Sequence, residues 1–324
     1  MNLLQDSYGR TFPYLRLSIT DVCNFKCKYC LPYGYFVNKK NFLSKKEILN
    51  LVSVFSNLGI KKIRITGGEP TVRKDFLLIA KNIKSFKSIK SLVFTTNGYK
   101  LEKIVKECYE IGFDGINVSL DSLNKYKFIY ITGNKFFNVV FNGIIKSISF
   151  NLKTKINVVL MKPFKLSDFK NYLNFVMITN VSVRFIELME TVDLEYFNKH
   201  YLRSIYIRNY LLNNGWFLNE HYKFDGPSLI FCNSNYRGNI GIIAPYLKNF
   251  CITCNRLRIS SSGNLHLCLF GNINYVYSLK LLFKNKNKKN LINFIKSILI
   301  NKNLSHKLYE GNTSFIKHLS DIGG

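Results

Sequence analysis

Six strand-like runs, separated by helix-like segments, constrain the fold of this chain more than any other feature of its sequence. The runs cover residues 14–20, 61–66, 91–96, 115–120, 154–160 and 182–188. One intervening helix has a clear start, because Ser44 and Glu47 form a capping box ahead of a series of apolar positions. Strands that alternate with helices predict a parallel sheet with helices packed on its outside.

Six such units fit either an open doubly wound sheet or a partly closed barrel, and the pattern alone does not separate the two. Both architectures place chemistry at the carboxyl ends of the strands. After the sixth unit the alternation stops, and the sequence predicts a helix over 202–212, short strands within 215–243 and a last helix over 290–300. We therefore expect an α/β core over residues 1–190 and a smaller C-terminal subdomain over residues 191–324.

The chain is strongly basic, with 47 Lys and Arg against 19 Asp and Glu and a formal net charge of +28. Such a charge attracts nucleic acid. However, Lys, Asn, Ile, Phe and Tyr are abundant together, which is typical of an AT-rich genome, so we expect the charge to help hold a small anionic substrate instead. Residues 1–10 lack the apolar stretch of a secretory signal, and no apolar run is long enough to span a bilayer. We expect a soluble protein of the cytoplasm, or of the stroma or matrix of an organelle, without a membrane partner.

Three cysteines, Cys23, Cys27 and Cys30, lie in the loop after the first strand with the spacing C-x3-C-x2-C. In a reducing compartment such a tight group predicts metal ligands and not disulfides. A structural zinc ion usually takes four protein ligands, whereas three thiolates on a four-iron cluster leave one iron open for another ligand. The count of three therefore favours a cluster, with zinc and a distant fourth ligand as the alternative.

A second triplet, Cys251, Cys254 and Cys268, has the spacing C-x2-C-x13-C. The residues between 259 and 267 predict a hairpin that turns at Ser262-Gly263, and strand alternation would then point His266 and Cys268 to the same side. A zinc ion held by three cysteines and His266 therefore remains an alternative to a second cluster.

The first triplet stands in the stretch Cys-Asn-Phe-Lys-Cys-Lys-Tyr-Cys, and the second strand is followed by Thr-Gly-Gly-Glu-Pro at residues 66–70. Together these stretches resemble the cysteine loop and the GGEP stretch of the radical S-adenosylmethionine (SAM) superfamily. The resemblance implies an α/β fold with a partial (β/α)6 barrel of the TIM type, a [4Fe–4S] cluster on the first triplet, and SAM on its open iron. Glycines suit the second stretch because its backbone must approach the ligand closely.

The residues around the second triplet indicate which family within the superfamily the chain resembles. Residues 251–258 read Cys-Ile-Thr-Cys-Asn-Arg-Leu-Arg and the sequence ends in two glycines, which is similar to the GTP 3′,8-cyclase family. The resemblance runs from residue 9 to the end and is weakest over 190–245. It implies a second [4Fe–4S] cluster in the C-terminal subdomain and a lyase of molybdenum cofactor (molybdopterin) biosynthesis. In that family, reductive cleavage of SAM gives a 5′-deoxyadenosyl radical that takes the ribose 3′ hydrogen of GTP, and 3′,8-cyclo-GTP is formed.

The resemblance also implies roles for individual residues. The residues expected to contact SAM are Tyr29, Gly68, Ser119 and Met189. Those expected to bind GTP are Arg16, Arg64, Thr95, Lys155, Arg256, Leu257 and Arg258, and arginine forks suit phosphate groups. Gly323 and Gly324 would be needed for cyclisation. Strand alternation places one more residue, Arg184, on the inner side of the sixth strand, from which it can reach the substrate.

The partners implied by the resemblance are GTP, an electron donor such as flavodoxin or ferredoxin, and a downstream cyclic pyranopterin monophosphate synthase; a homodimer is compatible with it. Two alternatives stay open at this point. One is another radical SAM enzyme with an auxiliary cluster, for example one that modifies a peptide, and the other is a zinc-bearing nucleic-acid-binding protein. The Arg256-Leu257-Arg258 stretch and the two final glycines favour the cyclase.

Overall fold

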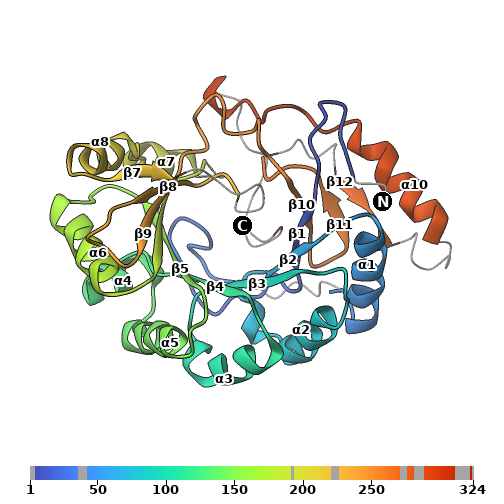
Figure 1. Cartoon of the computed structure of the whole chain (residues 1–324), viewed down its shortest axis with the longest axis horizontal. Helices are drawn as coiled ribbons and strands as arrows, with labels where there is room; N and C mark the ends of the chain where they lie inside the picture. Colours follow the sequence, from blue (N-terminus) through green and yellow to red (C-terminus); the bar gives the residue numbers. More distant parts are fainter. Residues whose placement is uncertain are drawn as a thin grey trace.

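The computed structural model of the chain describes residues 4–35, 42–190, 193–219, 226–270, 276–280, 288–310 and 322. Within these ranges, twelve strands form one sheet in the order β12-β11-β10-β1-β2-β3-β4-β5-β6-β9-β8-β7. Figure 1 shows this sheet curving into an open arc, with helices on its outer side. In the part of the chain that is described, no helix is long and apolar enough to cross a membrane.

The centre of the sheet consists of six parallel strands: β1 (Tyr14–Ser18), β2 (Lys62–Thr66), β3 (Ser91–Thr96), β4 (Gly115–Ser119), β5 (Thr154–Leu160) and β6 (Ser182–Glu187). The segments between them form α1 (Lys45–Asn57), α2 (Phe76–Lys84), α3 (Leu101–Ile111), α4 (Lys125–Thr132) and α5 (Phe137–Ser149), and α6 (Leu166–Ile178) follows β5. A short 3-10 helix, η1 (Pro70–Val72), follows β2. All six strands lie where the sequence predicts them.

The strands β1 to β6 follow one another in the sheet in chain order. A doubly wound sheet would reverse its strand order at a switch point, so that alternative is excluded and the partial barrel is confirmed. The arc is not closed, because β12 and β7 lie at its two ends.

The predicted start of α1 is also confirmed. The Ser44 hydroxyl accepts a hydrogen bond from the Glu47 backbone N–H at 3.3 Å, and the Glu47 carboxylate accepts one from the Ser44 N–H at 2.8 Å. The apolar positions that follow, among them Ile48, Leu51 and Val52, are buried beneath the helix. The capping box thus satisfies backbone N–H groups at the start of α1.

The C-terminal part of the chain extends both ends of the central sheet. At one end, β9 (Asn239–Ile243) pairs in parallel with β6, followed outward by β8 (Leu229–Cys232) and β7 (Phe217–Asn219); at the other, β10 (Arg256–Ile259) pairs in parallel with β1, followed by β11 (Asn264–His266) and β12 (Val276–Ser278). The remaining helices of the described residues are α7 (Leu194–His200), α8 (Ile205–Asn213), α10 (Lys288–Leu299) and the 3-10 helix η3 (Leu308–Glu310). The expected helices near 202–212 and 290–300 are therefore confirmed as α8 and α10. The division at residues 190 and 191 stays a prediction, since strands from both sides of it share one sheet.

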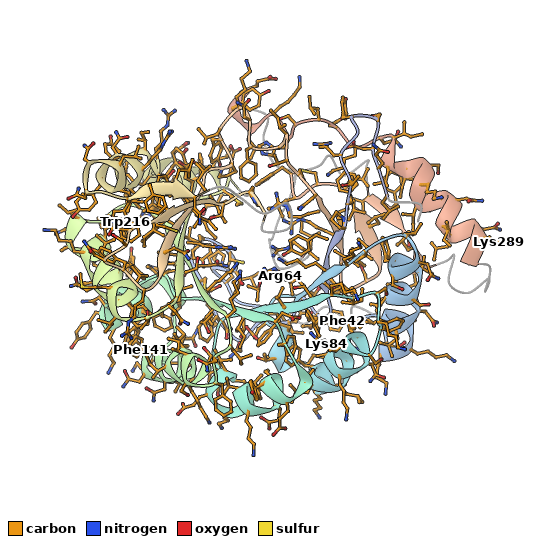
Figure 2. The ribbon with its side chains drawn as sticks, in the orientation of Figure 1. Phe42, Arg64, Lys84, Phe141, Trp216 and Lys289 are labelled. Carbon is orange, nitrogen blue, oxygen red and sulfur yellow. The ribbon has the colours of Figure 1, made fainter. Side chains whose placement is uncertain are left out.

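The two faces of the sheet differ sharply in character. Outward side chains such as Leu15 and Leu17 are fully buried in the apolar core beneath the helices. Inward positions of the same strands carry polar side chains, such as Arg16 on β1 and Asn117 on β4, and Figure 2 shows Arg64 on this inner side. A TIM barrel of the usual kind fills its interior with apolar residues. Here the inner face is instead available for a site.

Candidate active site

One cavity lies against the inner face of the sheet, and both cysteine triplets line it. Cys23, Cys27 and Cys30 reach it from the loop after β1, and Cys251, Cys254 and Cys268 reach it from the segments on either side of the β10–β11 hairpin. None of the six cysteines is in a disulfide. The two triplets are far apart in the sequence, and the fold brings them to a common space.

Most of the other residues singled out in the sequence line the same cavity. They are Tyr29, Gly68, Ser119, Met189, Arg16, Arg64, Thr95, Arg184, Arg256 and Arg258. Lys155 does not line it, although it lies on the same face of β5 as Asn157 and Val159, which do. Gly323 and Gly324 lie outside the described residues.

Leu257 is the one expected contact that the strand geometry turns away from the cavity. It stands between Arg256 and Arg258 on β10, and because alternate side chains of a strand point to opposite faces, it points outward. Its side chain is fully buried in the apolar core. Only its backbone is left for a contact inside the cavity.

The first cysteine loop is held in place from several sides. The Cys27 carbonyl accepts hydrogen bonds from the backbone N–H groups of Cys30 and Leu31, both at 2.9 Å, which closes a turn between the last two cysteines. The buried ring of Phe25 packs edge-on against Phe128 of α4, with ring centroids 6.2 Å apart. Burial raises the pKa of Cys23 to about 11. A metal that binds here must therefore displace a proton from this thiol.

The GGEP stretch packs directly on the cysteine loop. The Gly68 N–H donates to the Thr20 carbonyl at 2.9 Å, and the Glu69 N–H donates to the Val22 carbonyl at 2.8 Å. A Cβ atom on Gly68 would lie 2.4 Å from the Asp21 carbonyl oxygen, which no side chain can tolerate. The sequence predicts glycine at this position because the backbone must approach a ligand closely. The structure adds a second reason, because glycine also lets the GGEP stretch touch the cysteine loop.

Glu69 links this stretch to the next strand and does not line the cavity. Its carboxylate is fully buried and accepts hydrogen bonds from the hydroxyl of Thr71 at 2.6 Å and from that of Thr96 at 2.8 Å. The Asn97 side chain beside it donates to Asn24 of the cysteine loop at 2.8 Å. Glu69 therefore acts on the site through the position of its neighbours.

A buried acid stands near the first triplet. The Tyr29 hydroxyl donates to Asp121 at 2.9 Å, and the other carboxylate oxygen of Asp121 accepts from the Val159 N–H at 2.9 Å. Burial raises the pKa of Asp121 to about 6, although both hydrogen bonds oppose the rise. This side of the cavity therefore offers acceptors to a cationic or hydrogen-bond-donating ligand.

A row of arginines also lines the cavity. Arg258 on β10, Arg16 on β1 and Arg64 on β2 are direct neighbours across the sheet, and Arg256 lies two residues before Arg258 on the same face. Burial and the nearby charges of Arg258, Arg64 and Arg256 hold the pKa of Arg16 well below its usual range. Burial and Arg256 likewise lower the pKa of Arg258 to about 10.

The positive charges near Tyr14 lower the pKa of its hydroxyl. Burial would raise its pKa, but the charges of Arg64, Arg16 and Lys62 outweigh burial and lower it to about 7. The Arg64 Nε donates to the Tyr14 hydroxyl, and its Nη1 donates to Thr95 Oγ1 at 3.2 Å. Buried guanidinium groups that repel one another form a site for a polyanion such as a polyphosphate.

The second triplet is framed by the β10–β11 hairpin. The predicted turn is confirmed, with Gly263 at φ +88°, a left-handed conformation that favours glycine. His266 pairs with Arg258 across the hairpin and does not line the cavity. Because His266 is not among the described residues that line the cavity with the three cysteines, the geometry gives the zinc alternative with His266 no support.

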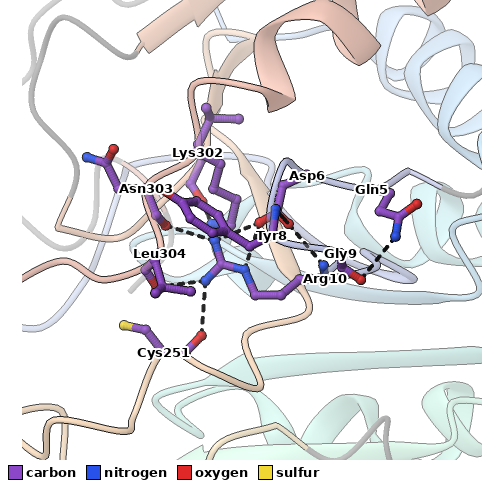
Figure 3. Close-up of polar contacts among 10 residues, drawn as sticks. Gln5, Asp6, Tyr8, Gly9, Arg10, Cys251, Lys302, Asn303 and Leu304 are labelled. Atoms are coloured by element: carbon purple, nitrogen blue, oxygen red, sulfur yellow. Dashed lines mark hydrogen bonds and ion pairs between the residues drawn. The ribbon is translucent and has the colours of Figure 1, made fainter.

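The N-terminal segment ties the second triplet to the segment that follows α10, as Figure 3 shows. Arg10 Nη1 donates to the carbonyls of Cys251 at 3.0 Å and Leu304 at 2.8 Å, and its Nη2 donates to that of Asn303 at 2.8 Å. Asp6 forms a buried ion pair with Arg10 at 2.7 Å, which holds the guanidinium in this position. The segment around Asn303 therefore lies beside Cys251.

Several cavity residues were not predicted. Polar Tyr14, Asn117 and Asn157 are at inward strand positions, so the alternation that identified Arg184 contained the signal for them. No local pattern marks His306, which lines the cavity beside the second triplet. Burial and Arg256 lower the pKa of His306 to about 4, so its ring is neutral near pH 7.

Comparison with known proteins matches residues 17–176 to the radical SAM superfamily and residues 181–308 to the family described as Molybdenum Cofactor Synthesis C. A protein of Psychromonas ingrahamii is 48% identical over 99% of this chain and 95% of its own length. A protein of Vibrio parahaemolyticus is 45% identical over 99% of this chain and 97% of its own length. Both bear the name GTP 3′,8-cyclase.

Solved structures resemble the chain in fold. Streptococcus suis SuiB bound to S-adenosylmethionine has a TM-score of 0.64 at 15% identity, covering 96% of this chain and 78% of SuiB. The enzyme anSMEcpe with bound AdoMet has a TM-score of 0.61 at 16% identity, covering 91% of this chain and 82% of its own. At these identities the likeness concerns the fold alone.

Proposed function

Because this chain belongs to the GTP 3′,8-cyclase family of radical SAM enzymes, we propose that its cavity holds GTP between two cysteine-bound iron–sulfur clusters. The enzyme is a lyase of molybdenum cofactor biosynthesis that converts GTP to 3′,8-cyclo-GTP. SAM and one [4Fe–4S] cluster follow from the superfamily. The observation that carries the site assignment is that both triplets and the arginine row line one cavity.

The residues present fit a cluster at each triplet. Each triplet supplies three thiols to one cavity, which suits a four-iron cluster with one open iron. When bound, the first cluster and SAM supply the 5′-deoxyadenosyl radical that removes the 3′ hydrogen of GTP. Tyr29, Gly68, Ser119 and Met189 would hold SAM beside the first triplet.

The charged side chains would orient GTP. Arg16, Arg64 and Arg258 bind the triphosphate, which relieves the repulsion among them, and the purine base lies toward the second triplet. Charge-assisted hydrogen bonds of this kind contribute about 1.5–3 kcal/mol each. Holding the ribose and the base of one molecule in a fixed arrangement brings C3′ and C8 within reach of each other and lowers the barrier to their bonding. Arg256, Thr95 and Arg184 complete the proposed substrate contacts in the cavity, and Lys155 would reach the substrate from the same face of β5.

Metal content tests this proposal. Protein reconstituted without oxygen should be brown and contain about eight iron and eight sulfide per chain, because each triplet takes one four-iron cluster. It should convert GTP to 3′,8-cyclo-GTP when SAM and a reductant are supplied. Zinc with little iron, measured by plasma emission spectroscopy, would refute the assignment.

Gly323 and Gly324 would enter the cavity and support cyclisation. The residue before them, Ile322, is only 5% exposed, so the chain is packed against the protein directly before the two glycines. Without side chains, both residues can pass through a narrow space. Deleting the pair should strongly lower formation of 3′,8-cyclo-GTP, with iron content and uncoupled SAM cleavage nearly unchanged. Substituting exposed Lys170 on α6 is the control, and cyclisation at the full rate by the truncated protein would contradict the role.

The remaining partners are proposals from the family. An electron donor such as flavodoxin or ferredoxin would reduce the first cluster, and cyclic pyranopterin monophosphate synthase would consume the product. A reducing compartment such as the cytoplasm suits the six free thiols. A homodimer is compatible with these roles, and sedimentation of the reconstituted protein would test it.

A further inference from the structure

His306 lies at the second triplet and has no part in the function proposed above. It follows α10 in a segment without cysteines and lines the cavity together with Cys251, Cys254 and Cys268. Two aromatic rings fix its orientation, with centroid distances of 5.8 Å to Phe250 and 5.0 Å to Phe270. The ring therefore occupies a defined place beside the space between the three thiols.

The hydrogen bonds of the ring identify which nitrogen carries the hydrogen. The Leu308 backbone N–H donates to His306 Nδ1 at 3.1 Å. A nitrogen that accepts a hydrogen bond has no hydrogen of its own, so in the neutral ring the hydrogen is on Nε2. His306 Nε2 is therefore a donor and cannot serve as a metal ligand in this tautomer.

Among the described residues, this donor has no acceptor. Nε2 is buried and finds no hydrogen-bond partner among the residues that the structure describes. A buried donor without a partner is costly, and each such case in a native protein calls for an explanation. Since none of the described residues supplies the acceptor, a group bound in the cavity at this point would satisfy the donor.

The same segment already directs donors at the second triplet. The backbone N–H of His306 and the side chain of Ser305 both hydrogen-bond to the Cys251 sulfur. Arg10 holds the adjoining residues, because it donates to the carbonyls of Asn303 and Leu304 as well as to that of Cys251. The segment thus places several hydrogen-bond donors near the Cys251 sulfur. His306 Nε2 is the donor that lacks an acceptor among the described residues.

We propose that His306 donates a hydrogen bond from Nε2 to a sulfur atom of the second cluster and thereby raises the reduction potential of that cluster. Reduction adds negative charge to a cluster, and hydrogen bonds to its sulfurs stabilise that charge. The inference rests on the proposed function, because it requires a cluster on the second triplet. His306 is then a positioning and tuning residue, not a ligand.

The test compares full-length His306→Phe, which keeps an aromatic ring without a donor, with His306→Gln, which keeps an N–H. Each is combined with Cys27→Ala so that only the second cluster is titrated. Potentiometric titration followed by electron paramagnetic resonance should show a shift to more negative potential in His306→Phe at unchanged iron content. His306→Gln should recover most of the shift. An unchanged potential in His306→Phe would overturn the inference, and so would weaker GTP binding with no change in potential.

A second measurement needs no substitution at His306. Pulsed electron paramagnetic resonance on unsubstituted protein labelled with nitrogen-15 histidine should detect a weak nitrogen coupling at the reduced second cluster. A strong coupling, as in a direct iron–nitrogen bond, overturns the inference, and so does the absence of any coupling. Failure of the proposed function is distinguishable, because unsubstituted protein would then contain only about four iron per chain.

Discussion

Replacing Cys27 with alanine is expected to abolish both SAM cleavage and GTP cyclisation, whereas replacing Cys254 should remove cyclisation alone. Cys27 belongs to the loop that carries Tyr29 and packs on the GGEP stretch, the side assigned to SAM. Cys254 lies at the arginine side, where Arg256 and Lys302 outweigh burial and lower its pKa to about 6. Loss of Cys27 therefore removes the source of the radical, and loss of Cys254 removes only the support of the substrate.

Separate assays of 5′-deoxyadenosine and 3′,8-cyclo-GTP distinguish the two outcomes. The lost activity should fall to the background rate in each case, with iron reduced by about half. Cys232→Ala is the matched control, because Cys232 is a half-buried free thiol on β8 outside both triplets, and it should keep both activities. If a folded Cys254→Ala protein loses SAM cleavage as completely as Cys27→Ala does, the division of roles is wrong.

Arg258→Met should weaken GTP binding roughly 10- to 150-fold, the equivalent of one charge-assisted hydrogen bond. It should also raise the melting temperature of the protein without GTP. Arg258 is only 6% exposed and stands next to Arg16 in the sheet. These neighbouring positive charges repel each other, and a neutral side chain of similar length at position 258 removes this repulsion. The arginine row thus lowers the stability of the protein without GTP and strengthens GTP binding.

Calorimetric titration with GTP and thermal unfolding measure the two effects on the same sample. SAM cleavage should be nearly unchanged, because Arg258 lies on the substrate side. Lys170→Met removes an exposed charge on α6 and should change neither quantity. Unchanged GTP affinity in Arg258→Met would show that the row does not bind the triphosphate.

The central fold could be predicted because each parallel strand is a short apolar run, legible from local sequence. The order of the strands in the sheet could not be predicted in this way. Whether the sheet is doubly wound or a partial barrel depends on whether successive strands pair in chain order, as Tyr14 with Lys62 and Lys62 with Ser91, which no local pattern encodes. The same holds for β9, whose place beside β6 is set by packing across the sheet.

The site was predictable to the extent that spacing and alternation describe it. Ligand spacing located both cysteine triplets, and alternation placed Arg184 correctly. Leu257 belongs to the same motif as its two arginine neighbours, although alternation turns its side chain into the core. The contact of Arg10 with Asn303 spans 293 residues, and that long-range tie, like His306, has no signature in the sequence around it.

The place of β10 beside β1 also affects how the chain is made. On the ribosome, β1 emerges early, yet its edge stays unpaired until β10 follows, and unpaired strand edges invite association with other chains. Arg10 is separated from Cys251 by 241 residues, so at about 5–20 residues per second it waits on the order of 10–50 s for its partner. The segments that carry Cys23 to Met189 are synthesised before the segment that carries Cys251. We therefore expect the proposed first cluster to be able to assemble earlier in translation than the proposed second cluster, which requires β10 and β11 to have joined the sheet.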